Sequence, residues 1–304
     1  MPRKKIILED SFETPIIKWV GGKTQIIDTV MSHFPNSINN YHEIFTGGGS
    51  VLLAFLSKVQ NKEIIMSGKA YSYDYNKKLI NLYKNIQQNV DEVIRELNIL
   101  CSDLKSCNVM DGNRKPTNIT EAKTSQESYY YWIRDVYNKT NDGSPLETAM
   151  FIFLNKTGFR GVYREGPNGF NVPFGHYKNP GIFEEEHLKR VSILIKDVEF
   201  IHNDFKDSLK NPTQHDFVYL DPPYAPETSK SFVGYTADGF KLEDHEKLFK
   251  IIKELPCNFL LSNADVSLVK DSFINYETII ISCKRSINSK NPSATTNEVL
   301  IKKS

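Results

Sequence analysis

Short runs of apolar residues occur towards both ends of the chain, several of them directly before a glycine or an acidic residue. Runs of this length, bounded in this way, are typical of β-strands. The predicted strands span residues 40–45, 70–73, 198–201, 217–220, 259–262, 276–283 and 298–302. Elsewhere apolar residues recur with a helical period, which predicts helices over residues 51–58, 79–100, 127–138, 144–154, 183–196 and 242–255.

The order of these elements divides the chain into three segments. Strand and helix patterns alternate over residues 1–80 and again over residues 197–304. The intervening residues 81–196 contain mainly helices and loops, including a polar stretch at 106–128 and a glycine-rich stretch at 158–181. This arrangement predicts an α/β sheet domain interrupted by a helical insertion, and we expect substrate selectivity to reside in the insertion.

Composition excludes several classes of protein. A chain of 304 residues with 39% hydrophobic content can bury a sizeable core. Its longest apolar runs are far shorter than the roughly 18 residues of a membrane-spanning helix, and no apolar signal core follows the basic N-terminus, so we expect a cytoplasmic protein without a membrane segment. The cysteines lack the spacing of zinc ligands or of a disulfide framework, so we expect no metal. The formal net charge of +1 neither indicates nor excludes nucleic-acid binding.

The tetrapeptide Asp221-Pro222-Pro223-Tyr224, directly after a predicted strand, has the strongest chemical signal. An exocyclic amine on a nucleobase is a poor nucleophile, and attack on a methyl group requires acceptors that draw its N–H bonds towards tetrahedral geometry. Consecutive prolines would hold the Asp221 carboxylate and the Pro222 carbonyl in one stiff turn. Tyr224 would offer a ring on which a planar base can stack. The competing interpretation is a Pro-Pro loop in which Asp221 only forms the turn.

Acidic residues and glycines follow three other predicted strands. Residues 46–50 form a glycine turn between a strand and a helix, and Asp74 ends the next strand at about the spacing of a ribose-binding acid. Asp204 and Phe205 follow a third strand, where they would contact an adenine amino group and ring. Together they predict a nucleoside pocket. The competing interpretations are a tight turn without a ligand and, for Asp204, a helix cap.

Two other nucleotide motifs are incomplete. Gly21-Gly22-Lys23-Thr24 resembles the end of a P-loop, but Ile17 occupies the position of the required first glycine. The glycine turn lacks the third glycine of the dinucleotide fingerprint, because Leu52 occupies that position. An NTPase and a nicotinamide enzyme are therefore disfavoured.

The glycine-rich stretch alternates basic with aromatic side chains. Arginine can bind guanine through two hydrogen bonds in the major groove, lysine can contact phosphate, and aromatic side chains can wedge between base steps. A solvated loop or a protein-binding loop would have the same composition. The residues concerned are Arg160, Arg164 and Lys178, with Phe159, Tyr163, Phe170, Phe174 and Tyr177 between them.

With these motifs in order, the chain resembles the Dam-like adenine-N6 DNA methyltransferases, the D12 class of alpha-group enzymes. The resemblance extends over nearly the whole length. It rests on Lys18-Trp19-Val20-Gly21-Gly22-Lys23, residues 43–50, Tyr73-Asp74-Tyr75-Asn76, Asn171-Val172-Pro173-Phe174-Gly175, Asp204-Phe205 and Asp221-Pro222-Pro223-Tyr224. The fold implied is a Rossmann-like, AdoMet-dependent methyltransferase domain, residues 1–80 and 197–304, with a helical, loop-rich target-recognition domain, residues 81–196.

The resemblance also implies a set of site residues. S-adenosyl-L-methionine would lie over the turn from Phe45 to Gly49, near Asp74, Asp204 and Phe205. Its binding residues would be Trp19, Lys23, Phe45, Gly47, Gly49, Asp74, Asp204, Phe205 and Asp221, the catalytic residues Asp221, Pro222 and Tyr224, and the DNA contacts Lys18, Arg160, Val162, Arg164, Pro173 and Tyr177. Arg160 departs from the asparagine of many relatives, which leaves its contacts with the DNA open.

The sequence thus predicts methyl transfer to adenine N6 in duplex DNA, in GATC, by an enzyme that is a monomer in solution. A restriction endonuclease acting on the same site is a candidate partner. The alternatives left open are a cytosine-N4 or RNA amino methyltransferase and a catalytically silent DNA-binding module.

Overall fold

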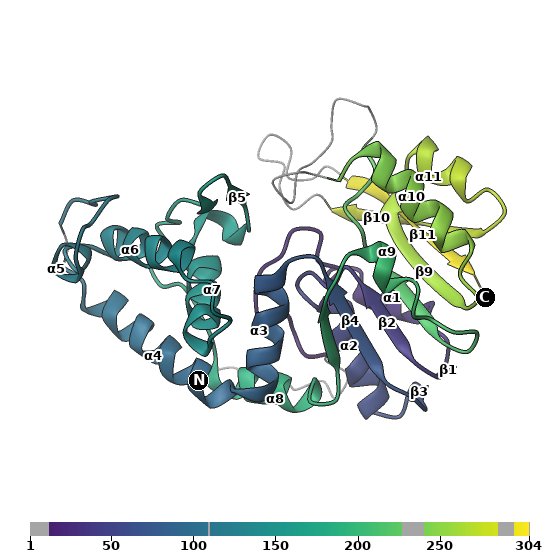
Figure 1. Cartoon of the computed structure of the whole chain (residues 1–304), viewed down its shortest axis with the longest axis horizontal. Helices are drawn as coiled ribbons and strands as arrows, with labels where there is room; N and C mark the ends of the chain where they lie inside the picture. Colours follow the sequence, from purple (N-terminus) through teal and green to yellow (C-terminus); the bar gives the residue numbers. More distant parts are fainter. Residues whose placement is uncertain (1–11, 109, 227–239, 285–294, 304) are drawn as a thin grey trace, which may run out of the picture.

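The fold centres on one twisted sheet with a helical lobe at its side (Figure 1). A computed structural model of the chain describes residues 12–108, 110–226, 240–284 and 295–303, so the basic N-terminal residues considered above lie outside it. The architecture confirms the predicted mixed α/β fold of a methyltransferase domain.

Within the described residues the main sheet has seven strands, of which β11 alone runs against its neighbours. From one edge to the other they are β7 (Glu199–His202), β4 (Ala70–Asp74), β2 (Tyr41–Ile44), β8 (Phe217–Leu220), β9 (Asn258–Ala264), β11 (Thr295–Lys303) and β10 (Glu277–Lys284). The chain passes from β2 outwards to β4 and β7 and then returns to β8 on the other side of β2. This reversal between β2 and β8 is the topological switch point, where open α/β sheets bind ligands.

Alternate residues of the strands pack into two separate cores. Phe217 and Tyr219 of β8 belong to one core, whereas Val218 and Leu220 belong to the other, and all four are buried. A strand buried on both faces has no polar side, which explains the continuous apolar runs in the sequence.

Helices cover both faces of the sheet (Figure 1). The first core includes buried residues of α1 (Ile27–Ser32), α2 (Ser50–Gln60), α3 (Lys77–Gln88) and α8 (Glu185–Leu194), and it continues into the helical lobe. The helices in the second core are α9 (Phe205–Ser208), α10 (Leu242–Lys253) and α11 (Ser267–Ser272). The helical lobe contains α4 (Val90–Ser106), α5 (Ile119–Ala122), α6 (Gln126–Lys139) and α7 (Pro145–Thr157), followed by the 3-10 turn η1 (Phe159–Gly161) and the hairpin β5 (Glu165–Gly166) and β6 (Gly169–Phe170).

Several short elements differ from the sequence prediction. The single helix expected over residues 79–100 is two helices, because Asn89 leaves helical geometry (φ −134°, ψ 33°) between α3 and α4. The apolar period continues through this break because both helices bury one face. Helix α3 packs on the sheet, whereas α4 packs in the lobe. The polar stretch 106–128 includes the one-turn helix α5. A separate parallel pair, β1 (Ser37–Ile38) and β3 (Ile65–Met66), was not predicted, because two residues are too few to form a pattern.

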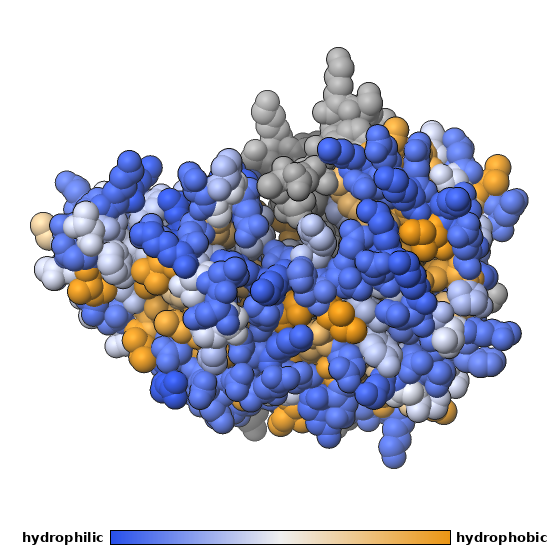
Figure 2. Space-filling view, viewed as in Figure 1, coloured by the Kyte–Doolittle hydropathy of each residue, from blue (hydrophilic) through white to orange (hydrophobic). Residues whose placement is uncertain are grey.

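The visible surface is mainly hydrophilic with scattered apolar patches (Figure 2). Among the residues that the structure describes, no helix is long and apolar enough to cross a membrane.

Candidate active site

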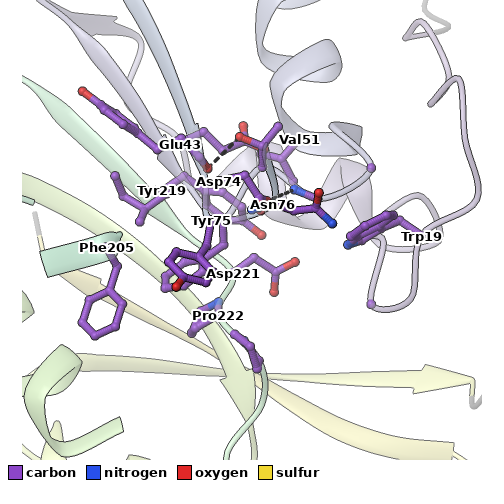
Figure 3. A pocket seen from close by; sticks show the side chains of 18 of the residues that line it. Trp19, Glu43, Val51, Asp74, Tyr75, Asn76, Phe205, Tyr219, Asp221 and Pro222 are labelled. Atoms are coloured by element: carbon purple, nitrogen blue, oxygen red, sulfur yellow. Dashed lines mark hydrogen bonds between the residues drawn. The ribbon is translucent and has the colours of Figure 1, made fainter. Parts of the chain in front are cut away.

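A cavity of about 360 Å³ opens at the carboxyl ends of the parallel strands, at the switch point of the sheet. Loops after β2, β4, β7 and β8 line it, and residues 19–22 of the N-terminal segment line it from another direction. Figure 3 shows Trp19 and Phe205 on opposite sides of this cavity, with Asp221 between them. The cavity therefore brings together residues that are about 200 positions apart in the sequence.

The turn after β2 has a backbone that few residues adopt. Phe45, Gly47 and Gly49 have positive φ angles of 72°, 51° and 71°. A Cβ atom on Gly47 would lie 2.8 Å from the Trp19 ring, and one on Gly49 would lie 2.6 Å from the Tyr83 hydroxyl. Glycine is therefore required here both by conformation and by space. Gly47 lines the cavity directly, whereas Gly49 caps α2.

Asp74 lies at the end of β4 and faces the same turn. Its carboxylate accepts hydrogen bonds from the backbone N–H groups of Gly47 at 3.0 Å and Asn76 at 2.8 Å. Burial raises the pKa of Asp74, and these two amides lower it. Each oxygen keeps one lone pair for a further donor, so the carboxylate can accept hydroxyl groups from a ligand in the cavity.

An aromatic cluster forms one end of the cavity. The rings of Phe45 and Phe205 have centroids 6.0 Å apart, and Phe240 lies 6.1 Å and 5.7 Å from them. Asp204 stands beside the cluster and caps α9, since its Oδ1 accepts the Lys206 N–H at 2.9 Å. Asp204 is thus a helix cap through its Oδ1, as the competing interpretation proposed, and it also lines the cavity. An apolar end with one carboxylate is suited to a heteroaromatic ring that carries an amino group.

Asp221 directly follows β8, one of the two strands at the switch point, and lines the cavity. Its Oδ2 accepts a hydrogen bond from Lys23 Nζ at 2.6 Å, and its side chain is 19% exposed. Its Oδ1 is buried and makes no hydrogen bond within the described part of the chain. Burial raises the pKa of Asp221 to about 6, with the charge of Glu298 raising it and Lys23 lowering it. A buried oxygen with no donor can accept an N–H from a bound amine, because an unpaired acceptor otherwise costs about 1–3 kcal/mol.

The Asp-Pro-Pro-Tyr segment is held from two strands. Asn263, at the end of β9, accepts the Ala225 N–H through its Oδ1 at 3.0 Å. Tyr224 donates its hydroxyl to Glu298 Oε2 on β11 at 2.7 Å. Lys23 Nζ lies 5.0 Å from the centroid of the Tyr224 ring. The sequence analysis identified neither Asn263 nor Glu298, since both follow the tetrapeptide by more than 35 positions without a motif of their own.

Glu43 is a second carboxyl group that the sequence analysis did not single out as a site residue. It is 2% exposed at the end of β2, lines the cavity and accepts the Tyr41 hydroxyl at 2.6 Å. Burial raises the pKa of Glu43 to about 8. A carboxyl group with this pKa is mainly protonated at neutral pH, so it adds little negative charge beside Asp221.

A second group of the predicted residues lies around the end of α7. Asn155, fully buried in α7, accepts the Lys18 N–H at 2.8 Å and donates to the carbonyls of Lys18 and Gly161. This bond set joins the N-terminal segment to η1. Lys18 also lies over the Tyr177 ring at 5.5 Å. Sequence reasoning missed Asn155, because a buried asparagine inside a helix has no sequence signature.

Arg160 has a positive φ of 57° at the tip of η1. Its backbone N–H donates to the Tyr177 hydroxyl at 2.9 Å, and its guanidinium lies 5.2 Å from the centroid of the Phe159 ring. Phe159 is 48% exposed. The other aromatic residues of this stretch are less accessible: Phe170 and Phe174 are buried, and Tyr163 stacks on Trp19. The expectation that aromatic residues here wedge between bases is therefore wrong for Phe170 and Phe174.

Arg164 is exposed at the start of the β5–β6 hairpin. Its Nε donates to Asn171 Oδ1 at 2.6 Å, which orients the guanidinium. Pro173 is exposed and Val162 is partly exposed on the segments that flank this hairpin. Their predicted roles in DNA binding stay predictions, as do those of Lys18, Arg160, Arg164 and Tyr177.

Two of the predicted cofactor residues do not line the cavity. Lys23 is behind Asp221 and bonds its carboxylate, and Gly49 is turned towards Tyr83. The residues that line it and were not predicted include Glu43, Tyr75, Asn76 and Phe240. Tyr75 and Asn76 directly follow Asp74, so the motif around that acid was a signal for both.

Comparisons with known proteins identify the family of the chain. The family profile described as D12 class N6 adenine-specific DNA methyltransferase matches residues 19–287. The chain is 36% identical over 289 residues to the Type II methyltransferase M.MjaIII of Methanocaldococcus jannaschii, covering 91% of this chain and 93% of that protein. It is 30% identical to the DNA adenine methylases of Haemophilus influenzae, with 96% and 93% covered, and of Escherichia coli, with 90% and 88% covered. The chain therefore belongs to the D12 class of N6 adenine-specific DNA methyltransferases.

Proposed function

We propose that this enzyme methylates the N6 amine of adenine in GATC sites of duplex DNA, with S-adenosyl-L-methionine as the methyl donor and Asp221, Pro222 and Tyr224 as catalytic residues. The observation that supports these roles most directly is the buried Oδ1 of Asp221, which lies at the cavity and has no hydrogen-bond partner among the residues that the structure describes. An adenine can reach this atom only outside the duplex stack, so the enzyme must flip its target base.

The cofactor would bind between Trp19 and the aromatic cluster. S-adenosyl-L-methionine supplies an electrophilic methyl group on a sulfonium ion. Asp74 would accept the ribose hydroxyls with the lone pairs that Gly47 and Asn76 leave free. Phe45 and Phe205 would pack on the adenine ring, and Asp204 would accept its amino group.

The catalytic residues would act on the target amine. The flipped adenine would stack on Tyr224 and donate its two N6 hydrogens to Asp221 Oδ1 and the Pro222 carbonyl. These acceptors shift the nitrogen towards tetrahedral geometry and localise its lone pair for attack on the methyl carbon. Asp221, with a pKa of about 6, is ionised at neutral pH and can take the proton that the nitrogen releases.

The test of these roles is an Asp221→Ala variant. Methyl transfer should fall by about a thousandfold or more, the range of a lost general base and acceptor combined. Affinity for S-adenosyl-L-methionine, measured by titration calorimetry, should stay nearly unchanged because the ribose and adenine contacts remain. Tyr224→Ala should lose about 1–3 kcal/mol of base stacking. Near-normal single-turnover transfer by Asp221→Ala would remove Asp221 from the chemistry.

The DNA would lie against the face formed by Lys18, η1 and the β5–β6 hairpin. Lys18 and Arg160 place positive charge there, and Val162, Pro173 and Tyr177 provide contacts beside it. Because these cations would neutralise DNA phosphates, the affinity for DNA should fall as the salt concentration rises. Relatives named DNA adenine methylase support an adenine in DNA as the target. Arg164, whose Nε donates to Asn171 Oδ1, would bind guanine O6 and N7 with its remaining N–H groups.

Specificity can be tested at single base pairs. Wild-type enzyme should methylate GATC duplexes faster than every single-base variant at fixed salt. Arg164→Ala should cost about 1–3 kcal/mol at the cognate site and relax selection at one base pair, whereas Lys178→Ala, an exposed control in the same stretch, should affect all sequences alike. Preference for another site would overturn GATC, and an unchanged Arg164→Ala profile would remove Arg164 from base recognition.

The biological setting follows from a relative's name. M.MjaIII is named a Type II methyltransferase. We therefore propose that the enzyme described here acts as a cytoplasmic monomer that protects DNA from a restriction endonuclease of the same specificity. Residues 81–196 would serve as its target-recognition domain. A nuclease that cleaves the enzyme's target sequence only when that sequence is unmethylated would support this pairing. Light scattering would measure the oligomeric state.

A further inference from the structure

We propose that Glu298 is a positioning residue of the methyl-transfer site, because its carboxylate accepts the Tyr224 hydroxyl and thereby fixes the ring on which the target base stacks. Glu298 belongs to β11, the strand that runs against the rest of the sheet. It is remote in sequence from the Asp-Pro-Pro-Tyr segment. The inference rests on the proposed role of Tyr224 and adds a residue that acts through it.

The geometry gives Tyr224 a defined position. Its hydroxyl donates to Glu298 Oε2 at 2.7 Å, the ordinary length of an O–H···O hydrogen bond. Glu298 is held in turn by the strand, since it pairs with Ala264 of β9 on one side and Ile281 of β10 on the other. A tyrosine in a loop can rotate about two side-chain bonds, and an anchored hydroxyl removes that freedom before the base arrives.

The backbone next to Tyr224 is held by the same region of the sheet. Asn263 on β9 accepts the N–H of Ala225, and its neighbour Ala264 is the strand partner of Glu298. The Tyr224 ring and the backbone of the next residue, Ala225, are thus anchored to adjacent positions of β9 and β11. A base that stacks on a ring fixed in this way meets Asp221 at a reproducible distance, which transfer to the N6 atom requires.

Glu298 also contributes to the charge around Asp221. Its negative charge raises the pKa of Asp221, opposite to the effect of Lys23. The other titratable groups that face Asp221 within the described residues are Glu43 on β2, Tyr219 on β8 and Tyr224 itself. Glu298→Gln should therefore shift the acid limb of methyl transfer to lower pH, whereas a residue that only stabilises the fold would leave its midpoint unchanged.

The experiment compares Glu298→Gln, Tyr224→Phe and the double variant in single-turnover methylation of a GATC duplex by the full-length enzyme. Glutamine keeps the size of glutamate and phenylalanine keeps the ring. Each single variant should slow transfer about tenfold, the loss expected for one hydrogen bond to a charged group, with unchanged affinity for S-adenosyl-L-methionine. The double variant should be no slower than about the slower single variant, because both changes break the same bond.

Two further measurements make the outcome decisive. A duplex with 2-aminopurine at the target adenine reports the stacking of the flipped base, and both single variants should leave its fluorescence less quenched than the wild type does. Asn297→Ala, an exposed neighbour on β11, is the matched control and should behave as wild type in all assays. Thermal unfolding must give the variants the midpoint of the wild type, and Glu298→Asp, which keeps the charge, should recover part of any loss.

Three results would overturn the inference. They are a wild-type transfer rate for Glu298→Gln, additive losses in the double variant, and an acid limb that does not move. If the proposed function itself is wrong, Asp221→Ala will transfer methyl groups at the normal rate, and this result differs from the three above. An inactive Asp221→Ala together with a fully active Glu298→Gln would reject only the role of Glu298.

Discussion

Lys23 sets the protonation of Asp221, and replacing it tests the electrostatics of the site. The Lys23 ammonium lies 2.6 Å from Asp221 Oδ2, and the two side chains are 3% and 19% exposed, so water screens the pair weakly. Burial raises the pKa of Asp221 to about 6 even with Lys23 in place. An opposite charge at this range lowers a carboxyl pKa by about 1–3 units, or about 1.4–4 kcal/mol. In Lys23→Gln the pKa of Asp221 should therefore rise above 6.

The direction of the pH effect on methyl transfer follows because the ionised carboxylate of Asp221 is the form that accepts the N–H of the target amine. The carboxylate predominates above the pKa, so wild-type transfer should fall as the pH drops through about 6. Transfer by Lys23→Gln should begin to fall at a higher pH than in the wild type and should recover in more alkaline buffer. The assay is single-turnover methylation at saturating S-adenosyl-L-methionine, which separates the chemistry from cofactor binding.

The control for this experiment is Lys69→Gln, which removes a lysine from an exposed ion pair with Glu199 at the edge of the sheet. Its pH profile should match that of the wild type. A midpoint near 6 in Lys23→Gln as well would refute the coupling between Lys23 and Asp221.

Two other predictions concern the cofactor and the glycine turn. Asp74→Ala and Asp204→Ala should each weaken binding of S-adenosyl-L-methionine by about 1–3 kcal/mol, the size of a hydrogen bond to a charged group, and unchanged titration isotherms for both would reject the pocket assignment. Gly49→Ala should lower the free energy of unfolding in urea by more than the 1–2 kcal/mol or so that a positive φ costs, because its Cβ would also meet the Tyr83 hydroxyl. Gly21 also has a positive φ, 82°, but there is open space where a Cβ atom would lie, so Gly21→Ala should show the conformational cost alone. Equal losses of unfolding free energy in the two variants would exclude the clash.

The sequence predicted the sheet well because its central strands are buried on both faces. Residues 217–220 are apolar at every position because each faces one of the two cores. A run this short, bounded by Asp216 and Asp221, is typical of a strand rather than of a helix. The acids that end these strands could also be recognised, since parallel strands bring their carboxyl ends to one edge whatever the order of the strands. Asp74, Asp204 and Asp221 therefore lie around one cavity, as expected.

The break at Asn89 could not be predicted in the same way. Apolar residues keep one helical period from α3 into α4. The period indicates that one face of each helix is buried, but it does not indicate which part of the protein covers that face. The sheet covers α3 and the lobe covers α4, so the change of direction depends on where those partners lie. Phe170 and Phe174 show the same limit, because an aromatic residue in a glycine-rich loop has the same local sequence whether it meets solvent or the core.

Local sequence contained the reacting groups, whereas long-range packing supplied their environment. The stiffness of Asp221-Pro222-Pro223-Tyr224 follows from proline geometry and needs no partner. The pKa of Asp221 depends on Lys23 and Glu298, which come from opposite ends of the chain. Electrostatic and desolvation energies depend on distances in space, and these are set only when the sheet assembles, so no pattern in neighbouring residues could have revealed them.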